Sequence, residues 1–386
     1  MPGPDSAGPL ALAAVVTNSA VCGSRVALAF SSLRGGGIQR GMLILAEGLL
    51  ARGLQVDLLI VDPRGALDSL VPEAARVVGL GGRRSLFALP AIVRYLRAER
   101  PIAVLAAQTH LNLVTLMART VAGTKTRVFV SEHIALDAVL AHDATWKERL
   151  FPLGARLLYP KADGIIVVSH DAAARFADAS GVPARLATVI HNPVVTCQLF
   201  EQAAAPVGHP WFADGEPPVL LSAGRLTRQK DHDTLLRAFA LVKESQPARL
   251  LILGEGDERA NLEALIDRLD LRADVQLLGF VLNPYALMAR ARLFVLSSRW
   301  EGFGNVLVEA MACGTPVVST DCPGGPSEIL QGGVFGRLAA VGDPRALADA
   351  VLLTLSAPIA PAVLRARAME FSAERSVHRH LEVMLS

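Results

Sequence analysis

Cysteine is scarce in this chain, and no cysteine stands in a pattern that commonly binds zinc or builds a disulfide framework. The four cysteines include no CxxC pair and have no histidine at zinc-ligand spacing. HExxH and GxSxG are absent too, and no Cys/His arrangement indicates a hydrolase or a metalloenzyme. We therefore expect the cysteines to be small buried side chains.

Charged residues, aromatic residues and long hydrophobic runs are also limited. Charged residues make up 19% and aromatic residues 5% of the 386-residue chain, against 52% hydrophobic residues, which argues against disorder and predicts cores built mainly of Ala, Leu and Val. No apolar run reaches the length of a membrane span. Because Asp5 stands where a secretory signal needs a basic flank, we expect residues 1–24 to be a loose leader and the protein to be cytoplasmic.

The net charge of +2 is small but unevenly distributed. The first 200 residues hold more Lys and Arg than Asp and Glu, and the remainder hold fewer. This excess is too dilute to predict nucleic-acid binding, but it fits a phosphate-bearing partner or peripheral contact with an anionic membrane surface. Residues 83–100 combine a basic rim with an apolar face, which indicates either a surface-seeking helix or, as the favoured interpretation, a helix packed on a sheet.

Short apolar runs alternate with helical stretches along both halves of the chain, as in βα units with parallel sheets. The predicted strands are Val26–Phe30, Val56–Val61, Ile102–Ala106, Arg127–Val130 and Gly164–Val168, then Val219–Ala223, Arg249–Leu253, Val275–Leu278, Leu293–Ser297 and Pro316–Ser319. The chain length predicts two domains. We predict an α/β protein with doubly wound domains at 25–195 and 218–365, a linker at 196–217, a C-terminal helix within 366–386, and ligands in the cleft between the domains.

The segment from Trp300 to Thr320 contains the densest group of candidate binding residues. Glu301 precedes a Gly-Phe-Gly loop, and the apolar spacing predicts a helix that starts near Asn305, is capped by it, and ends at Gly314. The first-turn amides of such a helix suit an anion. Glu301 and Glu309 suit the hydroxyls of a nearby sugar or ribose, whereas the alternative is that both are solvated carboxylates.

A second candidate site directly follows the predicted strand at Val219. Gly224 permits close approach of the backbone, and Arg225 and Lys230 place two cations in one loop, which suits a diphosphate. The alternative is an ordinary solvated loop. Asp231-His232-Asp233 matches the DxD pattern of metal-dependent sugar transferases, but its place at a helix start favours capping over metal binding.

Glycine loops and two histidines complete the candidates. Gly254 and Gly256 follow one predicted strand, and Gly36 and Gly37 follow another; neither pair completes the GxGxxG fingerprint, although both permit close approach of a ligand. His133 and His110 stand at strand ends in the basic half. Either can touch a reacting sugar or be a structural group.

The GRLxxxK motif at 224–230 and the Glu301-x7-Glu309 motif together resemble the retaining glycosyltransferases of family GT4, which have the GT-B fold. The resemblance extends over nearly the whole chain, with the early glycine loop, the hinge at 190–193, the Gly-Gly-Pro turn at 324–326 and a final helix around Phe371–Met384 that crosses back to the first domain. The stretch 322–330 resembles bacterial members that extend lipid-linked or surface polysaccharides.

The resemblance implies roles for the candidate residues. Arg225 and Lys230 would bind the donor diphosphate, Glu309 the ribose, and Glu301, with the backbone of Phe303, Gly304 and Asn305, the donor sugar and phosphates. His133, or in part Glu132 or His110, would contact the sugar from the opposite domain. The implied reaction retains configuration, needs no metal or cofactor, and moves a sugar from a nucleotide-sugar, most simply a UDP-sugar, to a glycan or lipid-linked acceptor, with the enzyme in the cytoplasm or at the cytoplasmic face of the membrane.

Three rival functions remain open from the sequence. A GT-B epimerase would consume a nucleotide-sugar without an acceptor. A non-catalytic two-lobed protein would bind free sugar, although no export signal supports it. An NAD-dependent dehydrogenase is disfavoured because the dinucleotide fingerprints are incomplete.

Overall fold

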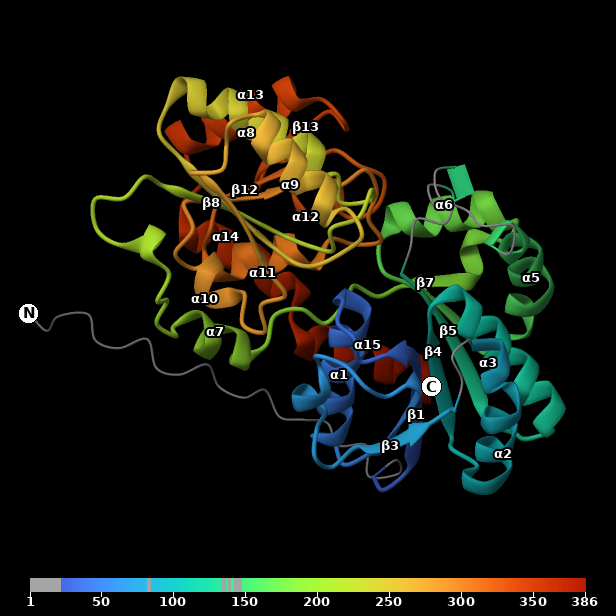
Figure 1. Ribbon diagram of the computed structural model, residues 1–386. Coiled ribbons are helices and arrows are strands. Elements are labelled where there is room, and N and C mark those ends of the chain that lie inside the picture. Colours follow the sequence, from blue (N-terminus) through green and yellow to red (C-terminus); the bar gives the residue numbers. More distant parts are fainter. Residues whose placement is uncertain (1–21, 82–84, 134–136, 138–139, 142–147) are drawn as a thin grey trace, which may run out of the picture.

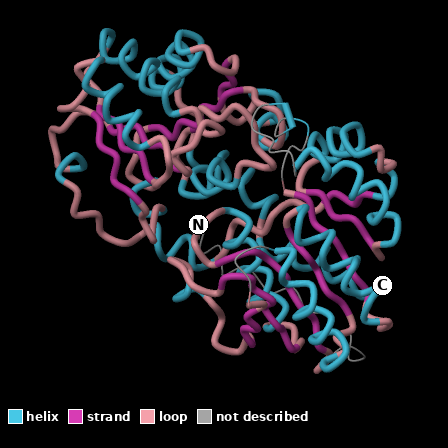
Figure 2. Tube along the Cα trace, turned by 45° about the vertical axis from the view of Figure 1, so that its right-hand side comes forward, coloured by secondary structure: helices cyan, strands magenta, loops and turns pink. Residues whose placement is uncertain are grey.

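The computed structural model describes residues 22–81, 85–133, 137, 140–141 and 148–386, so the expected leader lies almost wholly outside the described residues. Two α/β domains lie side by side, and each is a parallel sheet between two layers of helices (Figures 1 and 2). The strands of the first sheet lie between residues 25 and 189, and those of the second between 219 and 339.

The N-terminal domain contains a seven-stranded parallel sheet in the order β3-β2-β1-β4-β5-β6-β7. Its strands are β1 Arg25–Ser32, β2 Gln55–Asp62, β3 Arg76–Gly79, β4 Ala103–Ala107, β5 Arg127–Glu132, β6 Gly164–Val167 and β7 Ala187–Val189. Its helices are α1 Gly37–Leu50, α2 Leu89–Glu99, α3 Thr109–Ala122, α5 Phe151–Leu158 and α6 His170–Ser180. Because helices cover both faces, the inner strands are mainly continuous apolar runs rather than alternating, with the buried Asp57 of β2 and Glu132 of β5 as exceptions.

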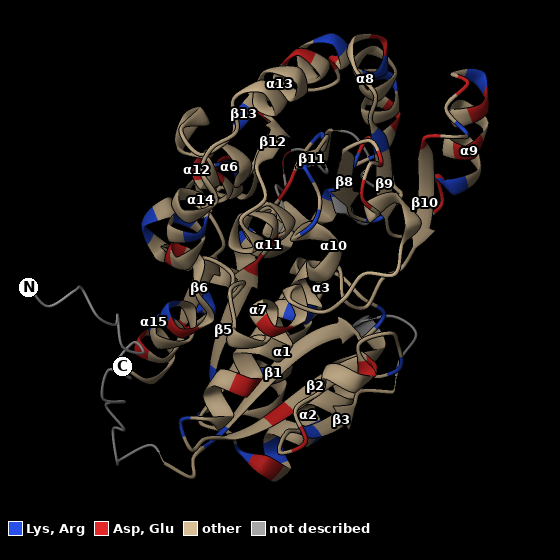
Figure 3. Cartoon of the chain, turned by 90° about the vertical axis from the view of Figure 1, so that its left-hand side faces the viewer, with Lys and Arg blue, Asp and Glu red and all other residues tan. Residues whose placement is uncertain are grey.

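The C-terminal domain repeats this plan with a six-stranded parallel sheet in the order β10-β9-β8-β11-β12-β13. Its strands are β8 Val219–Ala223, β9 Arg249–Leu253, β10 Val275–Gly279, β11 Leu293–Leu296, β12 Val317–Thr320 and β13 Arg337–Ala339. Its helices are α8 His232–Ser245, α9 Arg259–Arg268, α10 Tyr285–Met288, α11 Asn305–Cys313, α12 Pro326–Ile329, α13 Pro344–Ser356 and α14 Pro361–Ala368. Charged side chains are concentrated on the outer helices, and most of the strands are free of them (Figure 3).

The chain crosses between the domains twice. After β7 it passes through α7 (Cys197–Ala203) into the second domain, and after α14 it returns through α15 (Ala373–Leu385), which packs on α1 (Figure 1). A Cβ atom at Gly48 of α1 would lie 2.5 Å from Val377 Cγ2, so this glycine allows the two helices to approach closely. The final helix predicted from the sequence is therefore confirmed.

Every predicted strand is present, but the short edge strands β3, β7 and β13 were not predicted. Each has only three or four residues, with several side chains partly or fully exposed, and so none forms an apolar run. The helix in the 83–100 segment is α2, which buries Ile92, Val93 and Leu96 on the sheet and confirms the packed interpretation. The first two residues of that segment, 83 and 84, lie outside the described part of the chain.

The expectation that the cysteines are buried holds for two of the four. Cys313 and Cys322 are buried as expected, whereas Cys22 and Cys197 are exposed, because they lie just before β1 and at the start of α7, outside the cores.

Within the described residues no single helix is long and apolar enough to cross a membrane, although one helix pair bent by 118°, Pro344–Ser356 with Pro361–Phe371, meets that test on length and composition.

Candidate functional site

Lys230 and Glu301, predicted from separate motifs, form an ion pair in the structure. Lys230 Nζ donates to Glu301 Oε1, and the Ser298 hydroxyl donates to the same oxygen at 2.6 Å. The two residues follow β8 and β11, which are neighbours in the sheet. Glu301 is only 6% exposed, so a buried carboxylate meets its countercharge where two parallel strands end.

Arg225 differs from Lys230 because its side chain is exposed and has no ion pair or hydrogen bond with any residue that the structure describes. Gly224 fixes the start of this loop by donating from its amide to Leu253 O at 2.9 Å. A Cβ atom at Gly224 would lie 3.1 Å from Lys230 Cδ, which explains the small residue there. The loop therefore offers one unpaired guanidinium beside a paired ammonium.

Gly254 and Gly256 are glycines because two loops cross at this point. A Cβ atom on Gly254 would overlap the carbonyl oxygen of Gly224, and one on Gly256 would overlap that of Leu226. Leu226 N also donates to Glu255 O at 3.0 Å, which ties the loops after β8 and β9 together. Packing alone accounts for both glycines, and their predicted contact with a donor stays a prediction.

Helix α11 starts shortly after Glu301 of the Lys230–Glu301 pair, but Asn305 does not cap the helix as predicted. The cap position belongs to Gly304, whose φ of 101° favours glycine, and Asn305 is the first helical residue. The Asn305 side chain instead crosses to the N-terminal domain: its Oδ1 accepts from Asn192 Nδ2 at 2.8 Å and its Nδ2 donates to Gly37 O at 3.4 Å. Because the helix starts one residue earlier than predicted, the Asn305 side chain contacts the N-terminal domain and does not cap the first-turn amides of α11.

The glycine loop after β1 thus reaches the other domain, while its predicted contact with a donor stays a prediction. Gly36 has a φ of 142°, and a Cβ atom there would lie 2.6 Å from Gln39 Oε1. A Cβ atom on Gly37 would lie 3.1 Å from Asn305 Nδ2. A larger residue at Gly37 would therefore disturb the contact between the loop and α11, whereas one at Gly36 would meet Gln39 of α1.

Glu309 lies one turn inside α11, as predicted, and is 8% exposed. Burial raises the pKa of its carboxyl group, while the charge of Arg40 and a hydrogen bond from Tyr285 act in the opposite direction. The Tyr285 hydroxyl lies 3.5 Å from Glu309 Oε1. Neither Tyr285 nor Arg40 was among the predicted site residues, although Arg40 ends the glycine-rich segment.

The Phe303 ring is part of the core and not open to a ligand. It is 2% exposed and packs against the rings of His191 and Phe371, each at 5.3 Å between centroids. Only its backbone remains for the predicted role. The Gly324-Gly325 turn supports this loop, because Cβ atoms there would overlap the carbonyl oxygens of Glu301 and Phe303.

His133 and Glu132 follow β5 but have different environments. His133 Nε2 pairs with the Ser131 hydroxyl at 2.9 Å, and burial, with a smaller effect of the nearby His380, lowers its pKa to about 4. Glu132 is 1% exposed and is turned into the core, so the predicted role for it at the donor sugar is wrong. Its carboxylate accepts hydrogen bonds there from Thr109, Asn112 and Tyr159. His110 is partly exposed near the start of α3.

Asp231 occupies the N-cap position of α8, as predicted, but its carboxylate has other partners than the helix amides. It accepts from the Thr234 hydroxyl at 2.8 Å and pairs with Arg299 at 3.0 Å. His232 is buried. In the part of the chain that the structure describes, no three His, Cys, Asp or Glu side chains are grouped to hold a metal ion.

Several hydrogen bonds join the domains around the site. The Ser169 hydroxyl donates to Gly302 O at 3.1 Å, and Asp171 accepts from Gly324 N at 2.6 Å. Glu328 accepts from His170 N at 2.8 Å and pairs with His191 Nε2 at 2.6 Å. The loops of the C-terminal domain that carry Glu301 and the Gly-Gly turn are therefore held directly against the N-terminal domain.

Two family models match the chain, one on each domain. Residues 36–193 match the glycosyl transferase 4-like domain, and residues 209–371 match glycosyl transferases group 1.

Two curated relatives are glycosyltransferases. Over 230 residues, 60% of this chain and 60% of the relative, the chain is 34% identical to the N-acetylgalactosamine-N,N'-diacetylbacillosaminyl-diphospho-undecaprenol 4-alpha-N-acetylgalactosaminyltransferase of Campylobacter jejuni. Over 136 residues, 35% of this chain and 39% of the relative, it is 35% identical to a lipopolysaccharide core biosynthesis glycosyltransferase of Rhizobium meliloti. Both matches span less than two thirds of the relative.

Solved structures share the whole fold. Anabaena Alr3699/HepE, in complex with UDP and glucose, matches with a TM-score of 0.78 at 22% identity, covering 94% of this chain and 99% of that one. Sucrose-phosphate synthase from Thermosynechococcus elongatus matches with a TM-score of 0.74 at 22% identity, covering 94% and 96%. The fold is GT-B, as predicted, and with both family models matched the chain belongs to the GT4-type glycosyltransferases.

Proposed function

We propose that the protein transfers a sugar, with retention of configuration, from a nucleotide-sugar to a saccharide acceptor. The observation that carries the proposal is the Lys230–Glu301 ion pair where β8 and β11 end, with the exposed Arg225 in the same loop as Lys230 and with Glu309 in α11, the helix that follows Glu301. Cations and helix amides suit a diphosphate, and carboxylates suit sugar hydroxyls. A UDP-sugar is the proposed donor, in line with the UDP bound by the Anabaena protein.

In the proposed reaction, Arg225, Lys230 and the first-turn amides of α11 bind the donor diphosphate, Glu309 binds the ribose, and Glu301 binds the donor sugar. The Gly36–Gly37, Gly224 and Gly254–Gly256 backbones line the donor site. Negative charge grows on the diphosphate as the bond to the sugar breaks, and the two cations stabilise that charge without a metal or another cofactor. The acceptor hydroxyl attacks on the face that the nucleotide leaves.

We assign His133 the contact with the donor sugar from the N-terminal domain. Its pKa of about 4 means that the imidazole is neutral near pH 7 and can accept or donate one hydrogen bond without adding charge. A neutral partner suits a sugar hydroxyl better than a phosphate. His110 is the alternative at this position.

The proposed acceptor is a glycan or a lipid-linked saccharide of surface polysaccharide or glycoconjugate synthesis. The name of the Campylobacter relative describes a diphospho-undecaprenol substrate, and that of the Rhizobium relative describes lipopolysaccharide core synthesis. An enzyme that acts on such an acceptor works at the cytoplasmic face of a membrane, which we propose for this protein.

Helix α5 is the surface that best fits contact with an anionic membrane. Leu150, at its N-cap, and Leu153 and Leu157 are 55%, 57% and 61% exposed and recur at helical spacing. Exposed basic residues flank them at Arg149, Arg156 and Lys161, and α5 itself has no acidic residue. The helix packs on α3 through Gly154, where a Cβ atom would lie 2.9 Å from Leu113 Cδ1, and this packing leaves the leucines outside.

A thermal-shift titration with UDP, GDP, ADP, NAD and free sugars tests the donor site. A ligand at about 100 times its dissociation constant stabilises by about 2.7 kcal/mol. We expect one nucleoside diphosphate to stabilise the wild type and Arg237→Ala, which loses a surface ion pair on α8, but not Arg225→Ala. Stabilisation by NAD or free sugar alone would support a dehydrogenase or a sugar-binding protein, and donor consumption without an acceptor would support an epimerase.

Sedimentation with vesicles tests the membrane contact. We expect the protein to bind vesicles that contain phosphatidylglycerol but not vesicles of phosphatidylcholine alone, with high salt weakening the binding. Leu153→Ser with Leu157→Ser should reduce the bound fraction, whereas Leu353→Ser, at a position 53% exposed on the C-terminal domain, should not. Binding that ignores the α5 change would refute this surface.

A further inference from the structure

Arg40 of α1 reaches across the domain interface and holds the start of α10. Its Nη1 donates to the Tyr285 hydroxyl, and its Nη2 donates to Leu282 O at 3.2 Å. The guanidinium carbon lies 5.3 Å from the centroid of the Tyr285 ring. One arginine of the N-terminal domain therefore binds a backbone carbonyl and an aromatic residue of the other domain.

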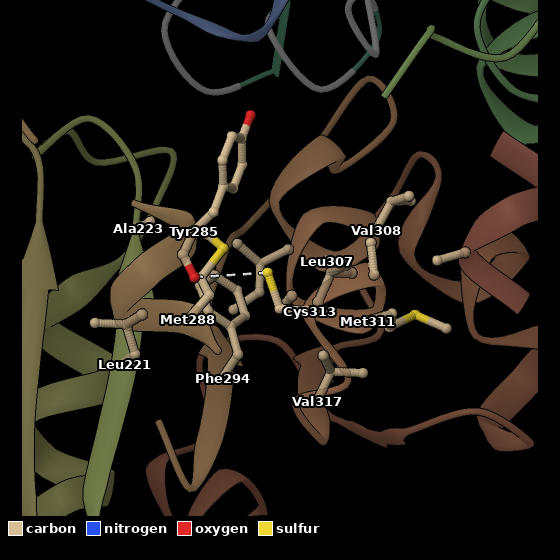
Figure 4. Close-up of a cluster of buried hydrophobic side chains, with 14 of the residues drawn as sticks. Leu221, Ala223, Tyr285, Met288, Phe294, Leu307, Val308, Met311, Cys313 and Val317 are labelled. Carbon is tan, nitrogen blue, oxygen red and sulfur yellow. Dashed lines mark hydrogen bonds between the residues drawn. The ribbon is translucent and has the colours of Figure 1, made fainter. Parts of the chain in front are cut away.

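Tyr285 connects Arg40 to Glu309. It is 4% exposed, and its hydroxyl lies 3.5 Å from Glu309 Oε1. In Figure 4 its ring projects out of the apolar cluster, and the hydroxyl points towards the ribbon of the N-terminal domain. Its carbonyl oxygen accepts from Cys313 Sγ at 3.7 Å, so the backbone of Tyr285 is also tied to the end of α11.

Glu309 needs a countercharge because it is buried. Two cations act on it, Arg40 more strongly than Lys230, and both oppose the rise in pKa that burial causes. Lys230 is already paired with Glu301. Arg40 is linked to Glu309 through the Tyr285 hydroxyl, so a charge that favours the ionised Glu309 comes from a side chain of the other domain.

We propose that Arg40 is a positioning residue that couples closure of the two domains to recognition of the donor ribose by Glu309. The inference rests on the proposed function, because it takes Glu309 as the ribose ligand. With the domains closed, Arg40 orients Tyr285 and favours the ionised carboxylate, whose two oxygens accept hydrogen bonds from the ribose hydroxyls. When the domains separate, Glu309 loses its countercharge, and its affinity for the ribose falls.

Thermodynamic linkage makes this coupling reciprocal. If closure strengthens ribose binding, then a ligand that carries a ribose diol must favour closure by the same factor. A ligand with the same base and diphosphate but no diol lacks this effect. The pair UDP and 2′,3′-dideoxyuridine diphosphate therefore isolates the contribution of Arg40.

Calorimetric titration of both ligands into the wild type, Arg40→Ala, Arg40→Lys, Tyr285→Phe and Glu309→Gln tests the inference. We expect the wild type to prefer UDP by about tenfold, and Arg40→Ala to lose most of that preference while its affinity for the dideoxy ligand stays within about twofold. Arg40→Lys should restore part of the preference. In a Glu309→Gln background, Arg40→Ala should not change the preference for UDP over the dideoxy ligand any further, because the negative charge of Glu309 is already removed.

Arg52→Ala is the matched control, since it removes a positive charge just after α1 where Arg52 Nη1 donates to Gly48 O at 2.9 Å, away from the interface. It should bind both ligands as the wild type does. If Arg40→Ala does not fold, the preference for UDP over the dideoxy ligand is compared between the wild type and the variants Arg40→Lys and Tyr285→Phe.

The outcomes separate the inference from the function on which it rests. A wild-type preference for UDP that survives in Arg40→Ala would overturn the coupling and leave the donor site intact. Equal weakening of both ligands in Arg40→Ala would also overturn it, because it would indicate a diphosphate contact. A wild type that binds UDP but does not prefer it to the dideoxy ligand would refute the ribose role of Glu309, and one that binds no nucleoside diphosphate would refute the proposed function as well.

Discussion

The two domains contribute to the site in different ways. In the C-terminal domain, Lys230, Ser298 and Glu301 form a buried group at the ends of adjacent strands, supported by loops whose glycines allow no side chain. The N-terminal domain contributes single groups that reach across the interface, among them Arg40, Asn192 and the Gly37 carbonyl. The C-terminal group, the built half of the site, forms within one domain. The N-terminal groups, the reaching half, complete the site only when the two domains are in contact.

Substitution of the two cations of the built half should have the largest effect. We expect Arg225→Ala and Lys230→Ala each to lose about 2–4 kcal/mol of transition-state stabilisation, about 30- to 1000-fold in rate. Steady-state transfer assays measure this, with Arg237→Ala as the control. Turnover within threefold of wild type for both variants would refute their role.

Stability should distinguish these two variants. Lys230→Ala leaves Glu301 buried without its partner and should lower the free energy of unfolding by about 3 kcal/mol, whereas Arg225→Ala removes an exposed side chain without an ion pair or hydrogen bond to the described residues and should lie within about 0.5 kcal/mol of wild type. Urea unfolding measures the difference. Equal stability of the two variants would contradict the paired state of Lys230.

A glycine in each domain provides the next comparison. Gly254→Ala should cost about 3 kcal/mol, because its Cβ atom would overlap the Gly224 carbonyl oxygen at a backbone φ of 139°. Gly123→Ala, after α3, has a φ of 65° but open space around it, and should cost only about 1 kcal/mol. Similar losses at the two positions would contradict the loop crossing.

Acid should destabilise the protein through three histidines, the buried His232 and His380 and the partly exposed His133. Burial lowers the pKa of His232 to about 3 and those of His133 and His380 to about 4, from an ordinary value of 6.5. Between these values the unfolded chain binds more protons than the folded one, so stability is full above pH 6.5 and falls as the pH drops below it. From pH 6.5 to pH 5, each such histidine should contribute a loss of about 2 kcal/mol.

Urea unfolding at pH 7 and pH 5 measures this loss. His232→Leu should flatten the pH dependence, whereas His378→Leu, which removes an exposed histidine of α15, should leave it unchanged. An unaltered slope in His232→Leu would show that this histidine is not held neutral.

The smallest effect should come from the interface itself. Asn192→Ala removes the 2.8 Å hydrogen bond to Asn305 and should cost about 1 kcal/mol of domain contact, seen as an increase of about fivefold in the KM for the donor. Asn261→Ala, which removes a surface hydrogen bond on α9, is the control. A donor KM equal to that of wild type would show that this contact does not contribute to closure.

The residues of the built half could be predicted from the sequence because each stands in a short local motif, although Lys230 and Glu301 are 71 positions apart and their pairing was not predicted. Glu301, Glu309 and the helix between them lie in one short segment, and strand-loop-helix order places Lys230 near them. The reaching half depends on contacts such as that between Arg40 and Tyr285, which are 245 positions apart. No local pattern in a single sequence specifies such a pairing.

The wrong predictions have local causes. Asn305 was assigned as a cap because the helix start was placed one residue late, and Glu132 was assigned to the cleft because the end of β5 does not reveal which way a side chain turns. The basic, apolar segment at 83–100 proved to pack on the sheet, whereas the exposed leucines lie on α5. Periodicity shows that a helix has an apolar face but not whether that face is covered.

The ion pair between Lys230 and Glu301 has a consequence for the proposed reaction. If the donor diphosphate binds Lys230, that ion pair must break, and the hydroxyls of the attached sugar would then replace Lys230 as hydrogen-bond donors to Glu301. Once the sugar has left, the remaining nucleotide holds Lys230 but leaves Glu301 alone, and we expect it to bind more weakly than the intact donor by a margin that titration of UDP-sugar against UDP measures. Re-formation of the Lys230–Glu301 ion pair would then favour release of the nucleotide product and return the site to its state before donor binding.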